Sequence, residues 1–283
     1  MRSLLITGGT GFLGRALARR LLADERDTDR ICIYSRDEAK QAAMRAELPD
    51  PDGRLRWFVG CVRDQPRLRR AMDGVDAVIS AAALKRVETA EENPTEVIAT
   101  NVIGAMNVLE AAREAGVKKI MGISTDKAPA AVNVYGATKF LMERLFVSAN
   151  NSRGAHGPIS SCCRYGNIAN STFSVIPKWR SMIARGAKRV PCTEPECTRY
   201  WMRVSEATDL ILDSMKIMRG GEVFIPTLPA YRLGDLAEAM GVEIEITGLP
   251  GTEKQHETMD GVTTSETARR MTVDELRSEL AML

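Results

Sequence analysis

The sequence lacks long apolar runs: no stretch of about 18 or more apolar residues occurs among its 283 residues. A helix that spans a bilayer needs about 20 such residues, so we predict no membrane-spanning segment. The basic, apolar and cleavage regions of a signal peptide are also missing, because the chain starts directly on a strand-like pattern, RSLLITGG. We therefore expect a soluble, cytoplasmic protein without a membrane partner.

Charge of one sign and metal-ligating side chains are also scarce. The 39 Lys and Arg residues nearly balance the 37 Asp and Glu residues, and the net charge of +2 gives no basis for broad nucleic-acid binding. Only two histidines occur, and Cys192 and Cys197 have no second cysteine pair at zinc-ligand spacing. We predict no metal site, and we interpret the six scattered cysteines as small buried hydrophobes of a reducing compartment.

What the sequence does contain is a regular alternation of apolar strands and helical patterns. The strands SLLIT, RICIY, LRWFVG, DAVISAAA and KKIMGIS alternate with helices from about Phe12 and Asp37, a short helix, and a long helix over Pro94 to Ala115. A further helix carries Tyr135, and PISSCCRYGNI reads as one more strand. The alternation predicts βαβ units, and hence an α/β fold with a Rossmann-type doubly wound parallel sheet.

A glycine-rich loop joins the first predicted strand to the first helix. In LLITGGTGFLG the spacing TGxxGxxG allows a tight turn and lets the backbone approach a pyrophosphate, which the helix N-terminus stabilises. The strand before the loop and the helix after it are the context that this motif requires. We therefore predict a dinucleotide cofactor bound by Gly8, Gly11, Phe12, Leu13 and Gly14.

The end of the second strand indicates which dinucleotide binds. NAD-binding proteins usually have an acidic residue there, about 20 residues beyond the glycines, to bind the ribose hydroxyls. This chain has Ser35 and Arg36 instead, a hydroxyl and a guanidinium that suit a 2′-phosphate. NADP is therefore favoured over NAD. The alternative left open is that Arg36 is a solvated charge and that Asp37 reaches the ribose.

The predicted domain organisation follows from the same rhythm. Residues 1–166 are expected to form an NADP-binding Rossmann domain. After Asn167 prolines punctuate shorter elements, and residues 167–283 are expected to form mainly a smaller C-terminal substrate-binding domain, with some segments returning to the Rossmann core. No linker or repeat separates the parts, so we expect them to pack closely.

The segment STDKAPAAVNVYGATK carries a second chemical signal. Tyr135 and Lys139 lie one helical turn apart on one face, so the ammonium can reach the phenol oxygen, an arrangement suited to alcohol oxidation. Asp126 and Lys127 come just before this helix and supply an additional acid and amine. The alternative is a turn before Pro129 in which the aspartate caps and the lysine is solvated.

These motifs and others, in order over nearly the whole chain, resemble the extended short-chain dehydrogenase/reductase superfamily. Within it, the sequence is most similar to inverting UDP-N-acetylglucosamine 4,6-dehydratases and related polysaccharide-biosynthesis nucleotide-sugar dehydratases. The matching segments are TGGTGFLG, YSRDEAKQ, AAALKRVETAEENPTEVIATNVIGAMNVLEAA, STDKAPAAVNVYGATK, RYGNI through VIP, TRYW, and GGEVFIPTLPAYRLGDLAEAM through EKQHE.

The resemblance implies a chemistry for the second signal. Tyr135 would take the proton of the sugar's 4-hydroxyl, which Thr125 hydrogen-bonds, while hydride leaves carbon 4; Lys139 would favour the phenolate. Lys127 would then take the proton from carbon 5 while Asp126 protonates the departing 6-hydroxyl, and the hydride would return to carbon 6. A lysine base needs its pKa lowered from ~10.4, and we expect burial or a neighbouring cation to do this.

The resemblance also implies further contacts to cofactor and substrate. Asn101 would support the site. The cofactor would also contact Cys61, Val62, Ala81, Ala82, Tyr135 and Lys139, and the UDP-sugar would contact Lys85, Asn167, Val175, Ile176, Arg199 and Glu257. Ordinary structural roles remain open for several of these residues: a solvated lysine, a strand-end asparagine, an apolar helix stripe and a surface salt bridge.

Two departures from the family pattern concern the nucleotides. Cys61, in GCVRD, replaces an acid expected near adenine, and GLPGTEKQHE lacks an arginine expected near the nucleotide ribose and inserts Thr252. Two other functions therefore stay open: a UDP-sugar 4-epimerase, which does not need Asp126 and Lys127, and a non-catalytic NADP-binding regulatory protein. The resemblance implies a homo-oligomer, either a dimer or a hexamer.

Overall fold

The buried strand β1 (Ser3–Thr7) lies inside a seven-stranded sheet. The strands run in the order β3 (Leu55–Val59), β2 (Arg30–Ser35), β1, β4 (Ala77–Ser80), β5 (Lys119–Ile123), β6 (Ile159–Cys163) and β9 (Val223–Phe224). All neighbouring strands in it pair in parallel. This order reverses direction at β1 and β4, which confirms the predicted doubly wound, Rossmann-type sheet.

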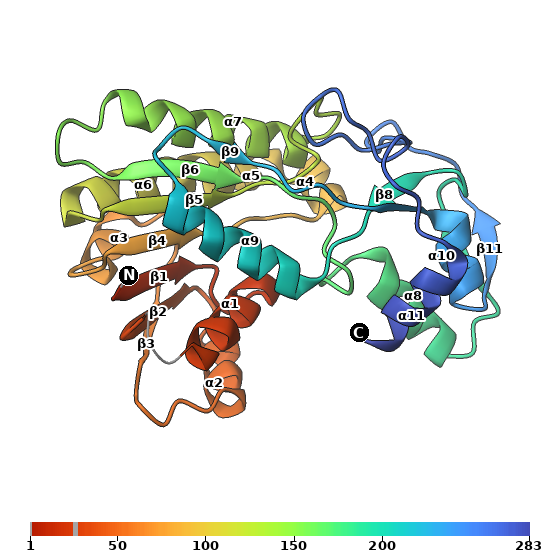
Figure 1. The fold of residues 1–283 in the computed structure, drawn as a ribbon, viewed down its shortest axis with the longest axis horizontal. Coiled ribbons are helices and arrows are strands. Elements are labelled where there is room, and N and C mark those ends of the chain that lie inside the picture. Colours follow the sequence, from red (N-terminus) through yellow and green to blue (C-terminus); the bar gives the residue numbers. More distant parts are fainter. Residues whose placement is uncertain (1, 25–27) are drawn as a thin grey trace.

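The computed structural model describes residues 2–24 and 28–283 and places helices on both faces of the sheet (Figure 1). Apolar side chains of α1, α2 and α9 pack on one face, and those of α3, α6 and α7 pack on the other. The helical elements before β6 are α1 (Phe12–Ala23), α2 (Glu38–Glu47), α3 (Gln65–Ala71), α4 (Val87–Glu92), α5 (Pro94–Ile98), α6 (Gly104–Ala115), α7 (Val134–Ser148) and the 3-10 turn η2 (Ala149–Asn151).

The long helix predicted over Pro94 to Ala115 differs from the prediction in one detail. A π-helical turn, η1 (Ala99–Ile103), separates α5 from α6 without breaking the helical backbone. Such turns insert one extra residue into the helical ladder and often mark functional positions. Asn101, at the middle of the turn, is buried.

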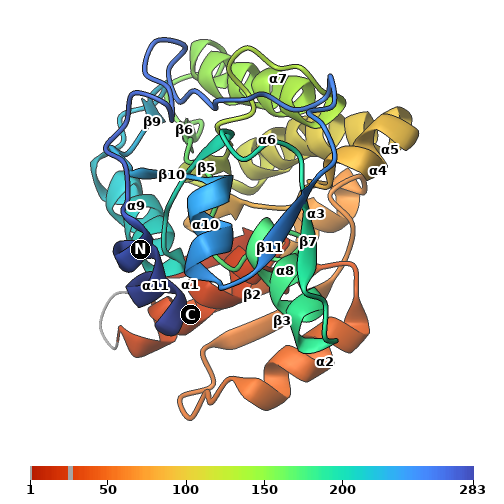
Figure 2. The ribbon, with the colours of Figure 1, turned by 90° about the vertical axis from the view of Figure 1, so that its right-hand side faces the viewer.

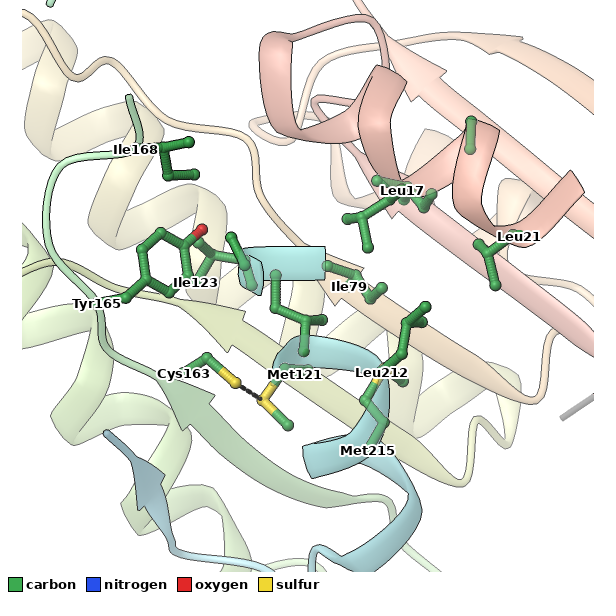
Figure 3. Close-up of a cluster of buried hydrophobic side chains, with 14 of the residues drawn as sticks. Leu17, Leu21, Ile79, Met121, Ile123, Cys163, Tyr165, Ile168, Leu212 and Met215 are labelled. Atoms are coloured by element: carbon green, nitrogen blue, oxygen red, sulfur yellow. Dashed lines mark hydrogen bonds between the residues drawn. The ribbon is translucent and has the colours of Figure 1, made fainter. Parts of the chain in front are cut away.

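Helix α9 (Val204–Ile217) returns from the second half of the chain to cover the sheet beside α1. Figure 3 shows Leu17 of α1 and Leu212 of α9 in one cluster with Ile79 and Met121 of neighbouring strands. Each fully buried side chain of this kind contributes roughly 1.5–3 kcal/mol, which fixes α9 and β9 to the Rossmann layers.

The remaining elements gather around a separate core at one end of the molecule (Figures 1 and 2). Two small sheets hold it: β7 (Arg189–Cys192) pairs with β11 (Glu243–Ile246), and β8 (Thr198–Tyr200) pairs with β10 (Ala230–Arg232). The helices are α8 (Val175–Ala184), α10 (Leu233–Ala239) and α11 (Val273–Ala281). Trp201 and Tyr231 meet there edge to face, with ring centroids 5.6 Å apart. The domain boundary near residue 167 stays a prediction.

The described residues can be compared with the expectations about cysteines, membrane spans and metal sites. All six cysteines are free thiols; five are buried, and Cys61 is partly exposed. Residues 2–24 and 28–283 contain no helix that is long and apolar enough to span a bilayer. The same residues contain no cluster of His, Cys, Asp and Glu that could hold a metal ion.

Candidate functional site

The glycine loop follows β1 and makes the tight turn that the sequence predicts. Gly8 has φ = +66°, and a Cβ atom there would lie 2.9 Å from the Ala82 backbone. A Cβ at Gly14 would lie 2.5 Å from the Gly9 carbonyl oxygen. Side chains at Gly8 and Gly14 would therefore separate the loop from β4 and from α1, which explains why glycine occupies both positions.

The start of α1 suits an anionic ligand. Gly11 caps the helix without a side-chain hydrogen bond, and the first turn, which includes Phe12 and Leu13, has no acidic residue. Backbone N–H groups and the positive end of the helix dipole are thus left for a phosphate. Thr7 Oγ1 accepts hydrogen bonds from the Ala81 and Ala82 amides, at 3.1 and 3.2 Å, and holds their loop beside the glycines.

Ser35 and Asp37 have defined partners at the end of β2. The Ser35 hydroxyl oxygen accepts a hydrogen bond from Gln41 Nε2 at 3.0 Å. Asp37 caps α2, because its Oδ1 accepts from the Lys40 amide at 2.9 Å. Arg36 between them is exposed. The Asp37 carboxylate, which could have favoured NAD, therefore already binds the backbone at the start of α2, while the Arg36 guanidinium faces solvent.

Cys61 lies close enough to Arg36 for the guanidinium charge to lower the pKa of its thiol. Burial raises the pKa of the Cys61 thiol, but the Arg63 hydrogen bond at 3.4 Å and the charges of Arg63 and Arg36 outweigh burial and lower it. Val62, the next residue, is buried, and its carbonyl accepts a hydrogen bond from Asn107 Nδ2 at 3.0 Å. The loop after β3 thus lies beside the end of β2, as a shared nucleotide site requires.

Asp126 and Lys127 point inward, and the Lys127 side chain is only 20% exposed. Asp126 has no exposed surface, and its amide donates to the Tyr165 carbonyl at 3.0 Å. Its Oδ1 accepts from the Thr125 hydroxyl at 3.0 Å and lies 3.1 Å from Lys127 Nζ. The alternative of a capping aspartate with a solvated lysine does not describe this arrangement, because the fully buried carboxylate pairs with a largely buried ammonium.

Lys127 has two more partners from distant parts of the chain. Its Nζ lies 3.0 Å from Glu257 Oε1 and 3.4 Å from Asn167 Oδ1, and Glu257 is only 3 % exposed. Asn167 and Glu257, both predicted to contact substrate, are therefore brought to the acid-base pair. Glu257 Oε2 and Asp126 Oδ2 are buried and have no hydrogen-bond partner among the described residues.

The charge state of Lys127 differs from the expectation. Burial lowers the pKa of Lys127, but the carboxylates of Asp126 and Glu257 outweigh burial and raise it. The predicted lowering is therefore wrong for this state of the protein. Lys85, at the edge of the site, is exposed, as the solvated-lysine alternative expects, and its pKa is lowered by partial desolvation and by the nearby Lys127 charge. Burial, opposed mainly by Lys127, raises the pKa of Asp126.

Tyr135 and Lys139 are both buried on α7, as expected for a one-turn spacing. Burial raises the pKa of Tyr135 to about 12, although the Lys127 charge and a hydrogen bond with the Thr125 hydroxyl act in the opposite direction. Burial lowers the pKa of Lys139 to about 8. Among the described residues, no hydrogen bond joins Lys139 to the Tyr135 phenol; its Nζ contacts Met142 Sδ at 3.4 Å.

Gly136 brings α7 against the acid-base loop, a role that the sequence reasoning missed. A Cβ at this position would lie 2.3 Å from the Lys127 carbonyl oxygen, so the helix and loop could not pack as they do. The amide of Gly136 donates to Asn133 Oδ1 at 2.7 Å, and Asn133 thereby caps the helix. A glycine directly after Tyr135, inside a helix, was the available sequence signal.

Asn101 ties the Lys85 loop to α7. Its Oδ1 accepts from the Leu84 amide at 2.9 Å, and its Nδ2 donates to the Leu84 carbonyl at 3.0 Å and to Thr138 Oγ1 at 3.1 Å. The π-helical turn thus uses its side chain to position neighbouring segments. The supporting role in catalysis that the resemblance implies stays a prediction.

The remaining predicted substrate residues have structural partners of their own. Arg199 is buried rather than part of a surface salt bridge; its Nη2 lies 3.1 Å from Glu253 Oε2, and its Nη1 donates to the Gln255 carbonyl at 3.1 Å. Ile176 is 1 % exposed in the core around α8, while Val175 at the helix start is partly buried. An apolar helix stripe, the alternative stated above, therefore describes Ile176.

Comparison with known proteins places these residues in a family. The profile of the family described as "Polysaccharide biosynthesis protein" matches residues 4–277. A protein of Campylobacter jejuni named "UDP-N-acetylglucosamine 4,6-dehydratase (inverting)" is 44% identical over 260 residues, which cover 91% of this chain and 77% of that protein. A Rickettsia canadensis protein named "UDP-glucose 4-epimerase" is 41% identical over 241 residues, covering 84% and 70% respectively.

The solved structures include a close match in three dimensions. The structure of Pen from Bacillus thuringiensis superposes with a TM-score of 0.92 at 30% sequence identity, and the match covers 100% of this chain and 98% of that one. The arrangement of sheet, flanking helices and C-terminal elements is therefore shared along the entire described chain.

Proposed function

Because this chain belongs to the polysaccharide biosynthesis protein family, we propose that it is a nucleotide-sugar 4,6-dehydratase that acts on UDP-N-acetylglucosamine and inverts carbon 5. The observation that carries this proposal is the buried Asp126–Lys127 pair beside Tyr135. The similarity to the Campylobacter jejuni dehydratase supports the substrate and the stereochemistry.

In the oxidation step, Tyr135 would accept the proton of the sugar's 4-hydroxyl, and Thr125 would orient that hydroxyl. When bound, the nicotinamide cofactor supplies the hydride acceptor and later returns the hydride. Lys127 is the cation that already favours the Tyr135 phenolate. Lys139, whose pKa is lowered to about 8, would add its charge on the other side of the helix turn.

In the elimination step, one proton shift prepares the acid-base pair. Lys127 Nζ and Asp126 Oδ1 share a hydrogen bond of 3.1 Å, so transfer of the lysine proton yields a neutral amine and a neutral carboxylic acid. The raised pKa of Asp126, caused by burial, favours this transfer, the raised pKa of Lys127 opposes it, and the buried Oδ2 of Asp126 has no hydrogen-bond partner among the described residues.

Lys127 and Asp126 can then carry out the elimination of water without another acid or base. The Lys127 amine takes the carbon 5 proton, the bond from carbon 6 to oxygen breaks, and Asp126 protonates the leaving oxygen to give water. Lys127 is again an ammonium and Asp126 a carboxylate, which is the ion pair seen here. Hydride return to carbon 6 and a solvent-derived proton on the opposite face of carbon 5 complete the inverting reaction.

We also propose that the cofactor is NADP, held by the glycine loop with Ser35, Arg36, Cys61 and Val62. The cap formed by Asp37 and the solvent-facing guanidinium of Arg36 support a 2′-phosphate over a ribose hydroxyl pair. The uncapped helix start and the glycine contacts support a pyrophosphate.

Replacing Arg36 by alanine is expected to weaken NADP binding by about 10- to 100-fold, because a hydrogen bond to a charged group contributes roughly 1.5–3 kcal/mol. NAD binding should change little, because NAD has no 2′-phosphate. Calorimetric titration of both cofactors measures the ratio, with the exposed Arg70→Ala variant as the control. Equal losses for the two cofactors would contradict the assignment.

The test of the proposed reaction is incubation with UDP-N-acetylglucosamine in heavy water, followed by mass spectrometry and proton NMR. Loss of one water, deuterium at carbon 5 and an L-arabino 4-keto product are expected. An unchanged sugar mass with an altered stereocentre at carbon 4 would favour the epimerase, the function named for the Rickettsia canadensis relative. NADP binding without turnover of any UDP-sugar would favour a regulatory protein.

We further propose a homodimer, joined through the outer faces of α6 and α7. Ile103 of η1, Met106 of α6 and Phe140 and Leu141 of α7 are 45–49% exposed, and α6 packs beside α7. A Met106→Glu/Phe140→Glu variant is expected to be monomeric by light scattering, whereas Ile217→Glu on α9 should leave the dimer intact. A wild-type monomer would contradict the proposal. The cytoplasmic location stays a prediction.

A further inference from the structure

A segment near the C-terminus lies directly over the acid-base loop. The Thr252 carbonyl accepts from Asn133 Nδ2 at 2.8 Å, and Lys254 Nζ donates to the Pro129 carbonyl at 2.7 Å. These contacts tie residues 252–257 to both ends of the turn between Lys127 and α7. The segment thereby encloses the acid-base pair from the side of the second core.

Glu257 is the residue of this segment that reaches the pair. Its amide donates to Ser265 Oγ at 2.9 Å, and its carbonyl accepts from the Ser265 amide at 2.8 Å, so the backbone is fixed on both sides. Its side chain is 3% exposed and places Oε1 3.0 Å from Lys127 Nζ and Oε2 3.6 Å from Lys254 Nζ.

Several charged groups surround this contact, and the carboxylates dominate. Asp126 and Glu257 raise the pKa of Lys127, whereas burial and Arg199 lower it. The Lys127 charge also lowers the pKa of Lys85, Tyr135 and Tyr231. Burial acts against ionisation of Glu257, but Lys127, Arg199 and Lys254 lower the pKa of its carboxyl. Glu257 is therefore an anion beside the proposed base.

We propose that Glu257 is a positioning residue that holds Lys127 against Asp126 and stabilises the Lys127 ammonium, both between reactions and after it has taken the carbon 5 proton. The inference rests on the proposed dehydratase function. It assigns Glu257 to the base rather than to the nucleotide, which differs from the substrate contact that the family resemblance implies.

The pH dependence of the reaction tests this role. In Glu257→Gln, the limb of the kcat profile that reports deprotonation of Lys127 is expected to move to lower pH by about one unit or more, because an opposite charge is lost. KM should stay unchanged, and Glu257→Asp should restore most of the wild-type profile. An increased KM with an unmoved limb would overturn the proposal in favour of substrate binding.

The Lys254→Met variant is expected to shift the same limb of the kcat profile in the opposite direction. Removing this cation leaves the Glu257 charge less compensated, so the same limb should move to higher pH. Glu253→Gln is the matched control, because this carboxylate lies in the same segment but pairs with Arg199. A purely structural role of the segment would lower kcat at every pH in both variants and move neither limb, which would also overturn the proposal.

A second readout does not depend on turnover. In protein with ¹⁵Nζ-labelled lysine, the Lys127 signal is identified by its absence from Lys127→Met, and its shift distinguishes ammonium from amine. It should titrate at lower pH in Glu257→Gln than in wild type. If that shift occurs but no UDP-sugar is dehydrated, the proposed function fails while the Glu257 contact stands. An identical titration in both proteins would overturn the inference itself.

Discussion

Replacing Lys127 by methionine is expected to slow sugar oxidation only moderately, through loss of the charge that favours the Tyr135 phenolate, and to lower the rate of water elimination by about 10²–10⁴-fold, the usual contribution of a positioned acid or base. Methionine keeps the unbranched, apolar stem but cannot accept the carbon 5 proton. Hydride removed from carbon 4 should then remain on the cofactor. Reduced-nicotinamide absorbance should accumulate while deuterium incorporation at carbon 5 stops.

The exposed Lys188→Met variant is the matched control and should turn over like the wild type. Circular dichroism should show Lys127→Met folded, since Asp126 can become neutral by taking up a proton, a change that its raised pKa already favours. Normal elimination in Lys127→Met would exclude this residue as the base. Loss of reduced nicotinamide together with elimination would mean that Lys127 acts before the oxidation.

The sequence predicted the parts of the site that depend on local pattern. Strand and helix periodicity located β1, α1 and the glycine loop, and the one-turn spacing placed Tyr135 and Lys139 on one buried face. The pair Asp126–Lys127 follows β5, and strand ends of a parallel sheet open onto its ligand-binding edge. Its position at that edge was therefore available from topology alone, whereas the orientation of the two side chains was not.

The sequence could not predict the charge state of Lys127. That property depends on Glu257, which is far away along the chain and reaches the lysine only through the packing of the C-terminal segment. Burial alone would have lowered the pKa, and the sign changed because two carboxylates lie within hydrogen-bonding distance. Long-range ion pairs of this kind leave no periodic signal in a single sequence.

The π-helical turn at Asn101 and the close approach at Gly136 have a similar origin. Residues 94–115 carry a continuous helical pattern, and the extra residue in the turn becomes apparent only through its side-chain contacts with Leu84 and Thr138. Gly136 is required because the Lys127 carbonyl occupies the space of a Cβ. Both features set the distances between neighbouring segments. The sequence pattern predicts only the order of these segments along the chain.

Replacing Tyr135 by phenylalanine is expected to stop the reaction one step earlier than Lys127→Met. The ring can keep its buried position, and loss of its hydrogen bond with Thr125 should cost about 0.5–1.5 kcal/mol of folding free energy. Without the phenol, no group takes the 4-hydroxyl proton, so kcat should fall by about 10²–10⁴-fold. Neither reduced-nicotinamide absorbance nor deuterium at carbon 5 should appear.

The contrast between the two variants carries the argument for the order of steps. Tyr200→Phe is the control, since this buried tyrosine also loses one hydrogen bond, to the Thr263 carbonyl, but should retain activity. If Tyr135→Phe accumulated reduced nicotinamide as Lys127→Met does, another group would be the oxidation base. Because the Lys127 charge also favours the Tyr135 phenolate, the double variant should behave as Tyr135→Phe alone: the blocked first step hides the second.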